Sequence, residues 1–421
     1  MLIEFSVSNY RSFREKQTLS MVATPRLSKK RNVFKPKVNG EKLPDLLKVA
    51  AIYGPNASGK SSLIQAMGVV NTLLMLKPTV DGALPVKAFR FDPDLREKAS
   101  VFEYHFVASE VRYQFVVGMT EQRITEEKLI AYPKGKETLL YDRFLTNSGE
   151  NYVFGEALEG GSGVHKAWRN LTSPQHMFLS QAVLNSSEDL NQLRIVLGWF
   201  KTSLWVIEQN AMPNWALASR SFIKRNPKYS ASLETFLREI DVPVSSVRLV
   251  SENKNISLFK GVDITLEDVP NLEQECKTTL THSSNLGEAD FDFSEESGGT
   301  KNLIGFWLPW VKMNLKLDDG GIGGMLAIDE FDSSLHPEIV ADLVDKHLDS
   351  GLIAQLIFTT HDTHLMNAKI LRRDQFWITE RDANGATNLF SVHDFVGREG
   401  EDVEKRYFEG RYRGLPLIHR R

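Results

Sequence analysis

The sequence contains a single cysteine, Cys276, among 421 residues. One thiol cannot form a disulfide within the chain, and disulfides persist mainly in oxidising compartments. Long apolar stretches are also lacking, because no uninterrupted run approaches the roughly 18 residues that a membrane-spanning helix needs. The first 20 residues mix charged with apolar side chains, unlike a signal peptide. We therefore expect a protein of a reducing, cytoplasmic compartment with no membrane segment.

The chain also lacks a strong excess of charge of either sign, with a formal net charge of −3. A surface built throughout for nucleic acid is thereby excluded, although a local basic stretch is not. One such stretch, residues 26–37, carries six basic residues and no acidic one. It is typical of a solvated loop, and contact with a polyanion such as nucleic acid, or with an acidic partner, is the alternative. Internal repeats and sustained heptads are absent, which indicates compact subdomains and no long coiled coil.

The sequence does contain a segment that fits the phosphate-binding pattern G-x-x-x-x-G-K-[ST]. This segment reads Gly54-Pro55-Asn56-Ala57-Ser58-Gly59-Lys60-Ser61-Ser62. Glycines let the backbone curl so that successive amides point at phosphate oxygens. Lys60 adds a positive charge near the outer phosphates, and the Ser61 hydroxyl stands where Mg²⁺ would bind. An apolar strand before the segment and a helical apolar stripe after it complete the expected context.

A pair of acidic residues, Asp329 and Glu330, follows a buried strand predicted at 324–328. A nucleotide-hydrolysing site needs a carboxylate near Mg²⁺ and a base or positioning group for the attacking water. We expect Asp329 to serve the metal and Glu330 to polarise water, an effect worth roughly 10²–10⁴-fold in rate. Two acidic residues in an ordinary loop are the alternative.

The segment Ser297-Gly298-Gly299 precedes a helix-like stretch at 300–310. A serine hydroxyl, glycine amides and a helix N-terminus together form an anion site. Because the chain already carries a phosphate loop, the simplest explanation is a sandwich dimer. In such a dimer this edge of one protomer closes over the γ-phosphate that its partner holds. A plain helix cap is the alternative.

Two further polar residues follow predicted strands. His361 comes after the buried strand at 352–358, and we expect it to hydrogen-bond the γ-phosphate, although a lone histidine is more often structural. Gln181 ends an apolar run at 177–181 that we interpret as a strand. From such a position Gln181 would bridge Mg²⁺ and the middle of the chain.

The order of these motifs resembles the ATP-binding-cassette branch of P-loop ATPases. The variety is that of the structural-maintenance-of-chromosomes, double-strand-break-repair and overcoming-lysogenization-defect families. The chain looks most similar to the RloA-like group of bacterial and archaeal ATP-binding proteins, many of which belong to abortive-infection and other anti-phage systems. The matching stretches are 9–13, 54–62, 297–300, 329–337, 359–361 and 407–416. Arg413 stands where the tail pattern of that group has a glycine.

The resemblance implies ATP and Mg²⁺ as ligands, with hydrolysis to ADP and phosphate by Lys60, Glu330 and His361. It implies a homodimer or larger homo-oligomer that ATP closes. It also implies that Arg11 contacts the nucleotide and that Gln181 contacts the metal. Independently of the resemblance, no Asn-Lys-x-Asp motif for reading guanine occurs, since residues 253–256 fail at the fourth position. A transporter subunit fits poorly, because no membrane segment is found and the insert between the motifs is long.

The sixty residues after His361 are too few for the metal-dependent nuclease domain that the overcoming-lysogenization-defect proteins append. We therefore expect a separate effector protein, a toxin or nuclease, that the ATPase restrains, recruits or triggers. Two alternatives stay open. One is a DNA repair or maintenance ATPase that binds DNA directly, and the other is a scaffold that binds ATP tightly and hardly hydrolyses it.

The fold that we predict is an α/β P-loop NTPase with an ABC/SMC-type head, an antiparallel β subdomain and a helical insert. Residues 1–80 would form the N-terminal part of the head, and 81–160 its β-rich lobe. Residues 161–245 would form the helical insert, and 246–421 the C-terminal part of the head. Strands outside the motifs are expected at 2–8, 17–22, 101–107, 112–117, 245–250, 255–259, 374–379 and 386–392.

Overall fold

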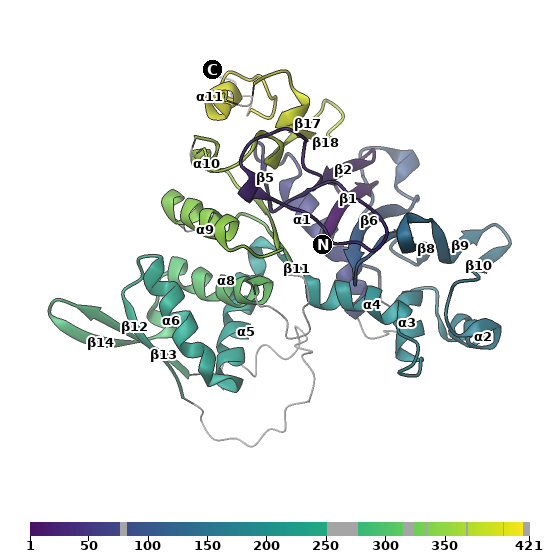
Figure 1. Ribbon diagram of the computed structural model, residues 1–421, viewed down its shortest axis with the longest axis horizontal. Coiled ribbons are helices and arrows are strands. Elements are labelled where there is room, and N and C mark those ends of the chain that lie inside the picture. The colour runs from purple at the N-terminus through teal and green to yellow at the C-terminus, as the bar shows by residue number, and fades with distance from the viewer. Residues whose placement is uncertain are drawn as a thin grey trace.

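The computed structural model describes residues 1–75, 82–250, 277–314, 324–333, 335–367, 369–398 and 400–415. These residues form an α/β protein with two large sheets, a helical region and two small sheets, as Figure 1 shows. Several expectations lie outside the described residues. They concern the motif at 253–256, the strand at 255–259 and the tail residue Pro416.

The first large sheet contains six strands in the order β11-β15-β16-β5-β17-β18. Its strands are β5 (Val49–Tyr53), β11 (Leu204–Ile207), β15 (Met325–Ile328), β16 (Gln355–Thr359), β17 (Phe376–Arg381) and β18 (Thr387–Ser391). All neighbours are parallel except β17 and β18, which form a hairpin. Strands β5, β15 and β16 are buried along their whole length. Their continuous apolar runs follow from this, because helices cover both faces of a parallel sheet.

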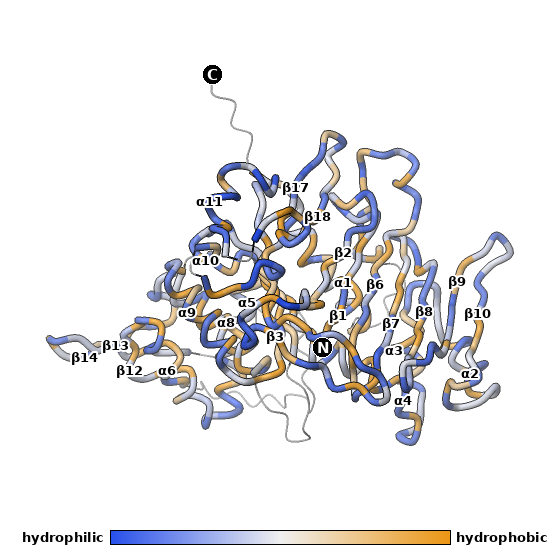
Figure 2. Tube along the Cα trace, turned by 45° about the horizontal axis from the view of Figure 1, so that its top comes forward, coloured by the Kyte–Doolittle hydropathy of each residue, from blue (hydrophilic) through white to orange (hydrophobic). Residues whose placement is uncertain are grey.

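Alternate residues of β5 face two different hydrophobic cores. Ala50 and Ile52 belong to the core that contains helix α1 (Lys60–Met75). The other residues of β5 belong to the core that contains α8 (Gly298–Asn314) and α9 (Pro337–Asp349). In Figure 2, hydrophobic residues gather along the interior strands, and the outer loops are mostly hydrophilic.

The second large sheet is antiparallel, with seven strands in the order β10-β9-β8-β7-β6-β1-β2. Its strands are β1 (Leu2–Ser8), β2 (Gln17–Ser20), β6 (Ser100–Ala108), β7 (Val111–Met119), β8 (Ile124–Tyr132), β9 (Thr138–Thr146) and β10 (Gly149–Phe154). The β6–β7 hairpin confirms the strands expected around residues 101–117. Its turn residues Ser109 and Glu110 both have positive φ, as a two-residue hairpin turn requires. Phe5 and Tyr104 share a core with α1, so this helix lies between the two large sheets.

Between β10 and β15 the chain is largely helical, apart from β11 and one small sheet. The helices are α2 (Gly161–Leu171), α3 (Phe178–Leu184), α4 (Gln192–Gly198), α5 (Met212–Arg225) and α6 (Ser230–Glu239). The small sheet contains β12 (Val244–Val250), β13 (Lys277–Ser284) and β14 (Gly287–Asp292), which project from the body in Figure 1. The remaining named elements include β3 (Val33–Phe34), β4 (Leu46–Leu47), α10 (His364–Asn367) and α11 (Val403–Phe408). None of the described helices is long and apolar enough to cross a bilayer.

The start of α3 overturns one expectation about the sequence. Residues 177–181 do not form a strand, because α3 begins at Phe178. The Glu127 carboxylate of β8 accepts hydrogen bonds from the Phe178 and Leu179 amides, at 2.6 and 2.9 Å. A carboxylate at this place satisfies free amides of the first turn and complements the helix dipole. A residue more than fifty positions away therefore stabilises the helical start of this apolar run.

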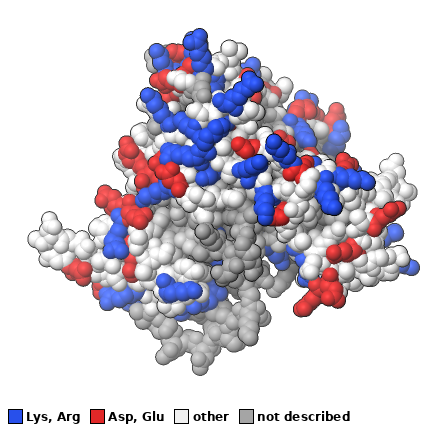
Figure 3. Space-filling model, viewed as in Figure 1, with Lys and Arg blue, Asp and Glu red and all other residues white. Residues whose placement is uncertain are grey.

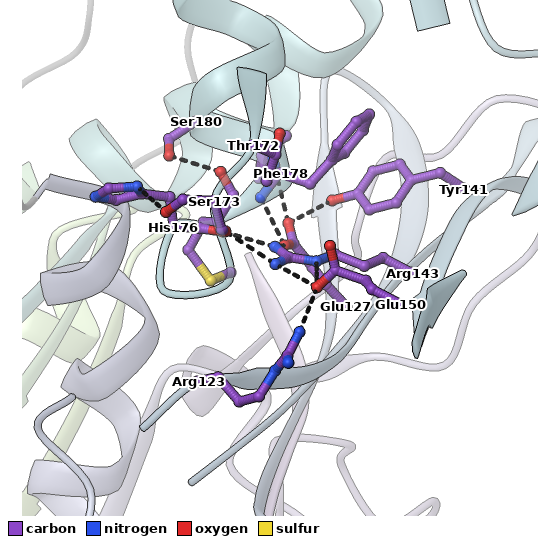
Figure 4. Close-up of polar contacts among 12 residues, drawn as sticks. Arg123, Glu127, Tyr141, Arg143, Glu150, Thr172, Ser173, His176, Phe178 and Ser180 are labelled. Carbon is purple, nitrogen blue, oxygen red and sulfur yellow. Dashed lines mark hydrogen bonds and ion pairs between the residues drawn. The ribbon is translucent and has the colours of Figure 1, made fainter. Parts of the chain in front are cut away.

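A buried ionic cluster surrounds Glu127, as Figure 4 shows. The guanidinium of Arg143, which is 1% exposed, lies 3.6 Å from the Glu127 carboxylate and 2.9 Å from that of Glu150. Arg143 also donates to the His176 carbonyl at 2.6 Å, in the segment before α3. Burial raises the pKa of Glu127, and the charge of Arg143 opposes this shift. The cluster ties the antiparallel sheet to the helical region.

The basic stretch at 26–37 lies partly against its own chain. Arg31 contacts both Asp345 and Asp349 of α9 at 2.6 Å. Lys29 donates a hydrogen bond to the Leu371 carbonyl. Figure 3 shows acidic and basic side chains interspersed over much of the visible face. These contacts leave fewer free cations for a polyanion than the sequence alone indicates.

Candidate nucleotide-binding site

The phosphate-loop segment, residues 54–62, connects the carboxyl end of β5 to the first turn of α1. Gly54 and Gly59 have φ values of 151° and 103°. A Cβ on Gly54 would lie 2.3 Å from the Thr379 hydroxyl, and one on Gly59 would lie 2.1 Å from the Thr387 hydroxyl. Both positions therefore require glycine, for backbone conformation and for space.

Two threonines of the β17–β18 hairpin support the loop. The Thr379 hydroxyl lies 2.5 Å from the Ser58 hydroxyl, and the Thr387 hydroxyl donates to the Ser58 carbonyl at 2.9 Å. The Thr387 amide donates to the Ser12 carbonyl at 2.7 Å, which brings the turn at 9–13 against the loop. Sequence reasoning missed both threonines, because they follow Ser58 by 321 and 329 positions and carry no motif of their own.

Lys60 is buried inside the curve of the loop. Its Nζ donates hydrogen bonds to the carbonyls of Gly54, at 2.9 Å, and Pro55, at 3.2 Å. Burial lowers the pKa of Lys60, and the negative charges of Asp329 and Glu330 oppose the shift. The ammonium group is thus held among backbone groups, where an anionic ligand of the loop would meet it.

The acidic pair, Asp329 and Glu330, directly follows β15, and β15 and β5 flank β16. The pair and the phosphate loop therefore share the carboxyl edge of the parallel sheet, where ligands of such sheets bind. Asp329 is 3% exposed, and its Oδ1 accepts a hydrogen bond from the Thr359 hydroxyl at 2.7 Å. Glu330 has a φ of 51°, and its amide donates to the same hydroxyl at 2.7 Å.

The strand on the other side of β15 is β11 (Leu204–Ile207), and Gln209 follows its carboxyl end. The Gln209 amide group donates a hydrogen bond to the Glu330 carboxylate. Gln181, which we expected at such a strand end, lies instead on α3. Among the described residues, its side chain makes no hydrogen bond with the phosphate loop or the acidic pair. Sequence reasoning missed Gln209 because it assigned residues 161–245 to a helical insert, although the apolar run of β11 is a strand signal.

His361 and Arg11 are both exposed side chains near this edge. His361 follows β16, and its amide donates to the Asp332 carboxylate at 3.2 Å. Arg11 has a φ of 51°, and its Nε donates to the Tyr10 hydroxyl at 3.2 Å. The neighbouring residue Ser12 contacts the β17–β18 hairpin that supports the phosphate loop. The structure thus brings both residues to the region of the site, with side chains open to solvent.

Ser297 stands immediately before α8, and its hydroxyl accepts a hydrogen bond from the Thr300 amide at 3.1 Å. The helix-cap interpretation is therefore correct as far as it goes. Ser297 and Gly298 are nevertheless exposed, and a Cβ added to Gly298 would meet no atom within 4 Å. In the described part of the chain, no hydrogen bond joins this segment to the phosphate loop. Its surface is open to another molecule.

Fold and site together define a P-loop nucleotide-binding protein. Residues 49–367 match the model of a family described as "AAA domain, putative AbiEii toxin, Type IV TA system". The match covers most of the chain, so the protein belongs to this family.

Several solved structures are similar to the chain at low sequence identity. The SmcHead bound to the C-winged helix domain of ScpA has 14% identity and a TM-score of 0.42, and the match covers 92% of this chain and 96% of that chain. The SMC head domain from Thermotoga maritima has 15% identity and a TM-score of 0.37, with 93% and 98% covered. The recombination mediator protein RecF-ATP has 15% identity and a TM-score of 0.41, with 93% and 99% covered. No curated protein matches the sequence.

Proposed function

We propose that the protein binds ATP with Mg²⁺ and hydrolyses it to ADP and phosphate. The observation that supports this proposal is that Lys60 lies at the same edge of the parallel sheet as Asp329 and Glu330, whose charges act on it. A cationic phosphate loop beside two carboxylates is the combination that phosphoryl transfer to water requires.

The residues at this edge fit a magnesium nucleotide. The glycine-containing loop supplies amides, and Lys60 supplies a charge for the phosphates. One Asp329 oxygen is held by Thr359, which leaves the other available to Mg²⁺ or its bound water. The Ser61 hydroxyl is a second oxygen donor, and oxygen ligands are those that Mg²⁺ prefers. A bound Mg²⁺ would neutralise charge on the phosphates, and Gln209, which contacts Glu330, is a better candidate than Gln181 to support it.

The remaining residues take roles at the outer phosphate and the nucleotide. Glu330 orients and polarises the attacking water. His361 contacts the γ-phosphate, since its exposed side chain follows the central strand β16. Arg11, beside the loop that Ser12 contacts, binds the nucleotide. ATP is favoured over GTP because the sequence lacks a guanine-reading motif.

Two copies of the chain complete each site in this proposal. The exposed Ser297-Gly298-Gly299 edge of one protomer contacts the γ-phosphate bound by the other. ATP therefore favours a closed homodimer, within a larger homo-oligomer where one forms, and hydrolysis releases it. Such a ligand acts as a switch only to the extent that it binds the closed state more tightly than the open one.

In the cell, we propose that this switch controls a separate toxic effector in an anti-phage or abortive-infection system. The support is the family description, which names AbiEii and a toxin–antitoxin system. Direct DNA binding has less support, because Arg31 and Lys29 of the basic stretch take partners within the chain.

The proposal is tested by measuring ATP turnover and oligomeric state together. Glu330→Gln should bind ATP, hydrolyse it at least 100-fold more slowly and accumulate as a closed assembly. Lys60→Ala and Ser297→Arg should each be inactive alone, whereas a mixture of the two should regain up to a quarter of wild-type turnover. The mixture works because one of the two sites in a mixed dimer is intact. If subunit exchange is confirmed and the mixture still recovers no turnover, the composite site is refuted. Wild-type turnover in Glu330→Gln would refute the role of Glu330 as the base.

A further inference from the structure

One residue holds three consecutive positions of the acidic segment. Thr359, the last residue of β16, is fully buried. Its hydroxyl donates to Asp329 Oδ1 at 2.7 Å and accepts a hydrogen bond from the Glu330 amide at 2.7 Å. Its backbone carbonyl accepts a third hydrogen bond, from the Phe331 amide at 3.0 Å.

The Thr359 hydroxyl donates its only proton in one of these contacts and accepts in the other. A threonine hydroxyl has one proton to donate and two lone pairs that accept. Because the proton goes to Asp329 Oδ1, this carboxylate has one oxygen fixed and one remaining. Because a lone pair of the hydroxyl accepts the hydrogen bond from the Glu330 amide, the backbone of Glu330 is anchored. Its φ of 51° is a value that residues other than glycine seldom adopt.

We infer that Thr359 is a positioning residue that sets the orientation of both Asp329 and Glu330 for the proposed hydrolysis of ATP. The inference rests on the proposed function, and it assigns to one buried hydroxyl the alignment of the metal-binding and water-polarising groups. Valine has nearly the same shape but cannot donate or accept. Serine keeps the hydroxyl and loses only a methyl group.

A purely structural role predicts a different result. A threonine that only fills space would be replaced well by valine and less well by serine, because serine leaves a cavity. A threonine that positions the acidic pair would be replaced better by serine than by valine. The order of the two variants in turnover therefore separates the two roles, whatever happens to stability.

The experiment compares wild type, Thr359→Val and Thr359→Ser in the full-length protein. Measured are the kcat and KM for ATP, the affinity for a non-hydrolysable ATP analogue with and without Mg²⁺, and the melting temperature. Without Mg²⁺, we expect the affinity of Thr359→Val for the analogue to be within about threefold of wild type. The increase in affinity that Mg²⁺ causes in wild type should be mostly lost in Thr359→Val, and its kcat should be lower by about 100-fold or more. Thr359→Ser should stay within about tenfold of wild type in kcat. Thr172→Val is the matched control, because it removes a buried threonine hydroxyl in the helical region.

Two results overturn the assignment. One is a kcat of Thr359→Val equal to that of wild type, and the other is a kcat of Thr359→Ser no higher than that of Thr359→Val. If wild type itself does not hydrolyse ATP, the proposed function fails separately. The positioning role of Thr359 is then tested by analogue binding alone. If Mg²⁺ raises the affinity for the analogue equally in wild type and Thr359→Val, that role is refuted.

Discussion

The side chains of Gln209 and Glu330 are joined by a hydrogen bond although they stand 121 positions apart in the chain. Each follows a strand of the parallel sheet, and the two strands, β11 and β15, are neighbours. The residue that we propose as the water-polarising base is thus in contact with a side-chain amide that directly follows the edge strand of the sheet. Any change in the position of β11 would reach Glu330 directly.

The first prediction separates the two glutamines. Gln209→Ala should lower kcat for ATP by about 10-fold to 100-fold, because Glu330 loses its side-chain partner and the site loses an oxygen donor. Gln181→Ala should leave kcat within twofold, because Gln181 lies on α3. Steady-state ATPase assays on both variants test this prediction, and the reverse order of effects would restore the role predicted for Gln181.

The second prediction concerns Gly59, which immediately precedes α1. Gly59→Ala should abolish ATP binding, because the new Cβ would lie 2.1 Å from the Thr387 hydroxyl at a φ of 103°. Gly161→Ala is the control, since its φ is also positive, at 69°, but nothing lies within 4 Å. The control should cost about 1 kcal/mol of stability and spare binding. Calorimetric titration with ATP, together with thermal unfolding, checks both variants, and tight binding by Gly59→Ala would contradict the packing described here.

The third prediction concerns the buried ionic cluster. Arg143→Met should lower the free energy of unfolding by about 3–5 kcal/mol, because it leaves the Glu127 carboxylate buried without its counter-charge. The matched control is Arg248→Met, which breaks an exposed pair with Asp290 and should cost less than about 1 kcal/mol. Urea unfolding at pH 7 measures both values. Equal losses in the two variants would mean that burial adds nothing to the Arg143 pair.

The fourth prediction concerns pH. His347 of α9 is buried, and burial lowers its pKa from 6.5 to about 4. In the unfolded chain His347 is protonated below pH 6.5, whereas in the folded protein it is protonated only below about pH 4. Stability should fall as pH falls through this window, by up to about 3 kcal/mol from this one group.

Unfolding by urea at several pH values tests this dependence. In His347→Gln the contribution should vanish, so stability should change less between pH 6.5 and pH 4 than in wild type. His393→Gln, at an exposed site, should keep the wild-type dependence. A His347→Gln profile parallel to that of wild type would show that other groups govern the acid sensitivity.

Local motifs predicted the elements on which the phosphate loop and the acidic pair lie, because the spacing of each motif is tied to one local structure. The phosphate loop lies between a strand and a helix as expected, and the acidic pair follows a buried strand. The apolar run before Gln181 was misread because a short apolar run suits a strand and a buried helix equally. The first turn of the helix is capped by the Glu127 carboxylate, a contact that no local pattern reveals. Thr359 was noted only as part of the motif with His361, and its role emerges from the pairing of β15 with β16.

The order of strands in the parallel sheet has a consequence for how the chain is made. The β5 strand receives a hydrogen bond from the side chain of Gln375, which follows it by 326 positions. At the usual 5–20 residues per second, the ribosome needs roughly tens of seconds to deliver this partner. The strands of the antiparallel sheet, from Leu2 to Phe154, are all synthesised well before that. A nascent chain thus carries the phosphate-loop sequence well before Thr379 and Thr387, which support the loop, have been synthesised. We therefore expect nucleotide binding to begin only after the β17–β18 hairpin has left the ribosome.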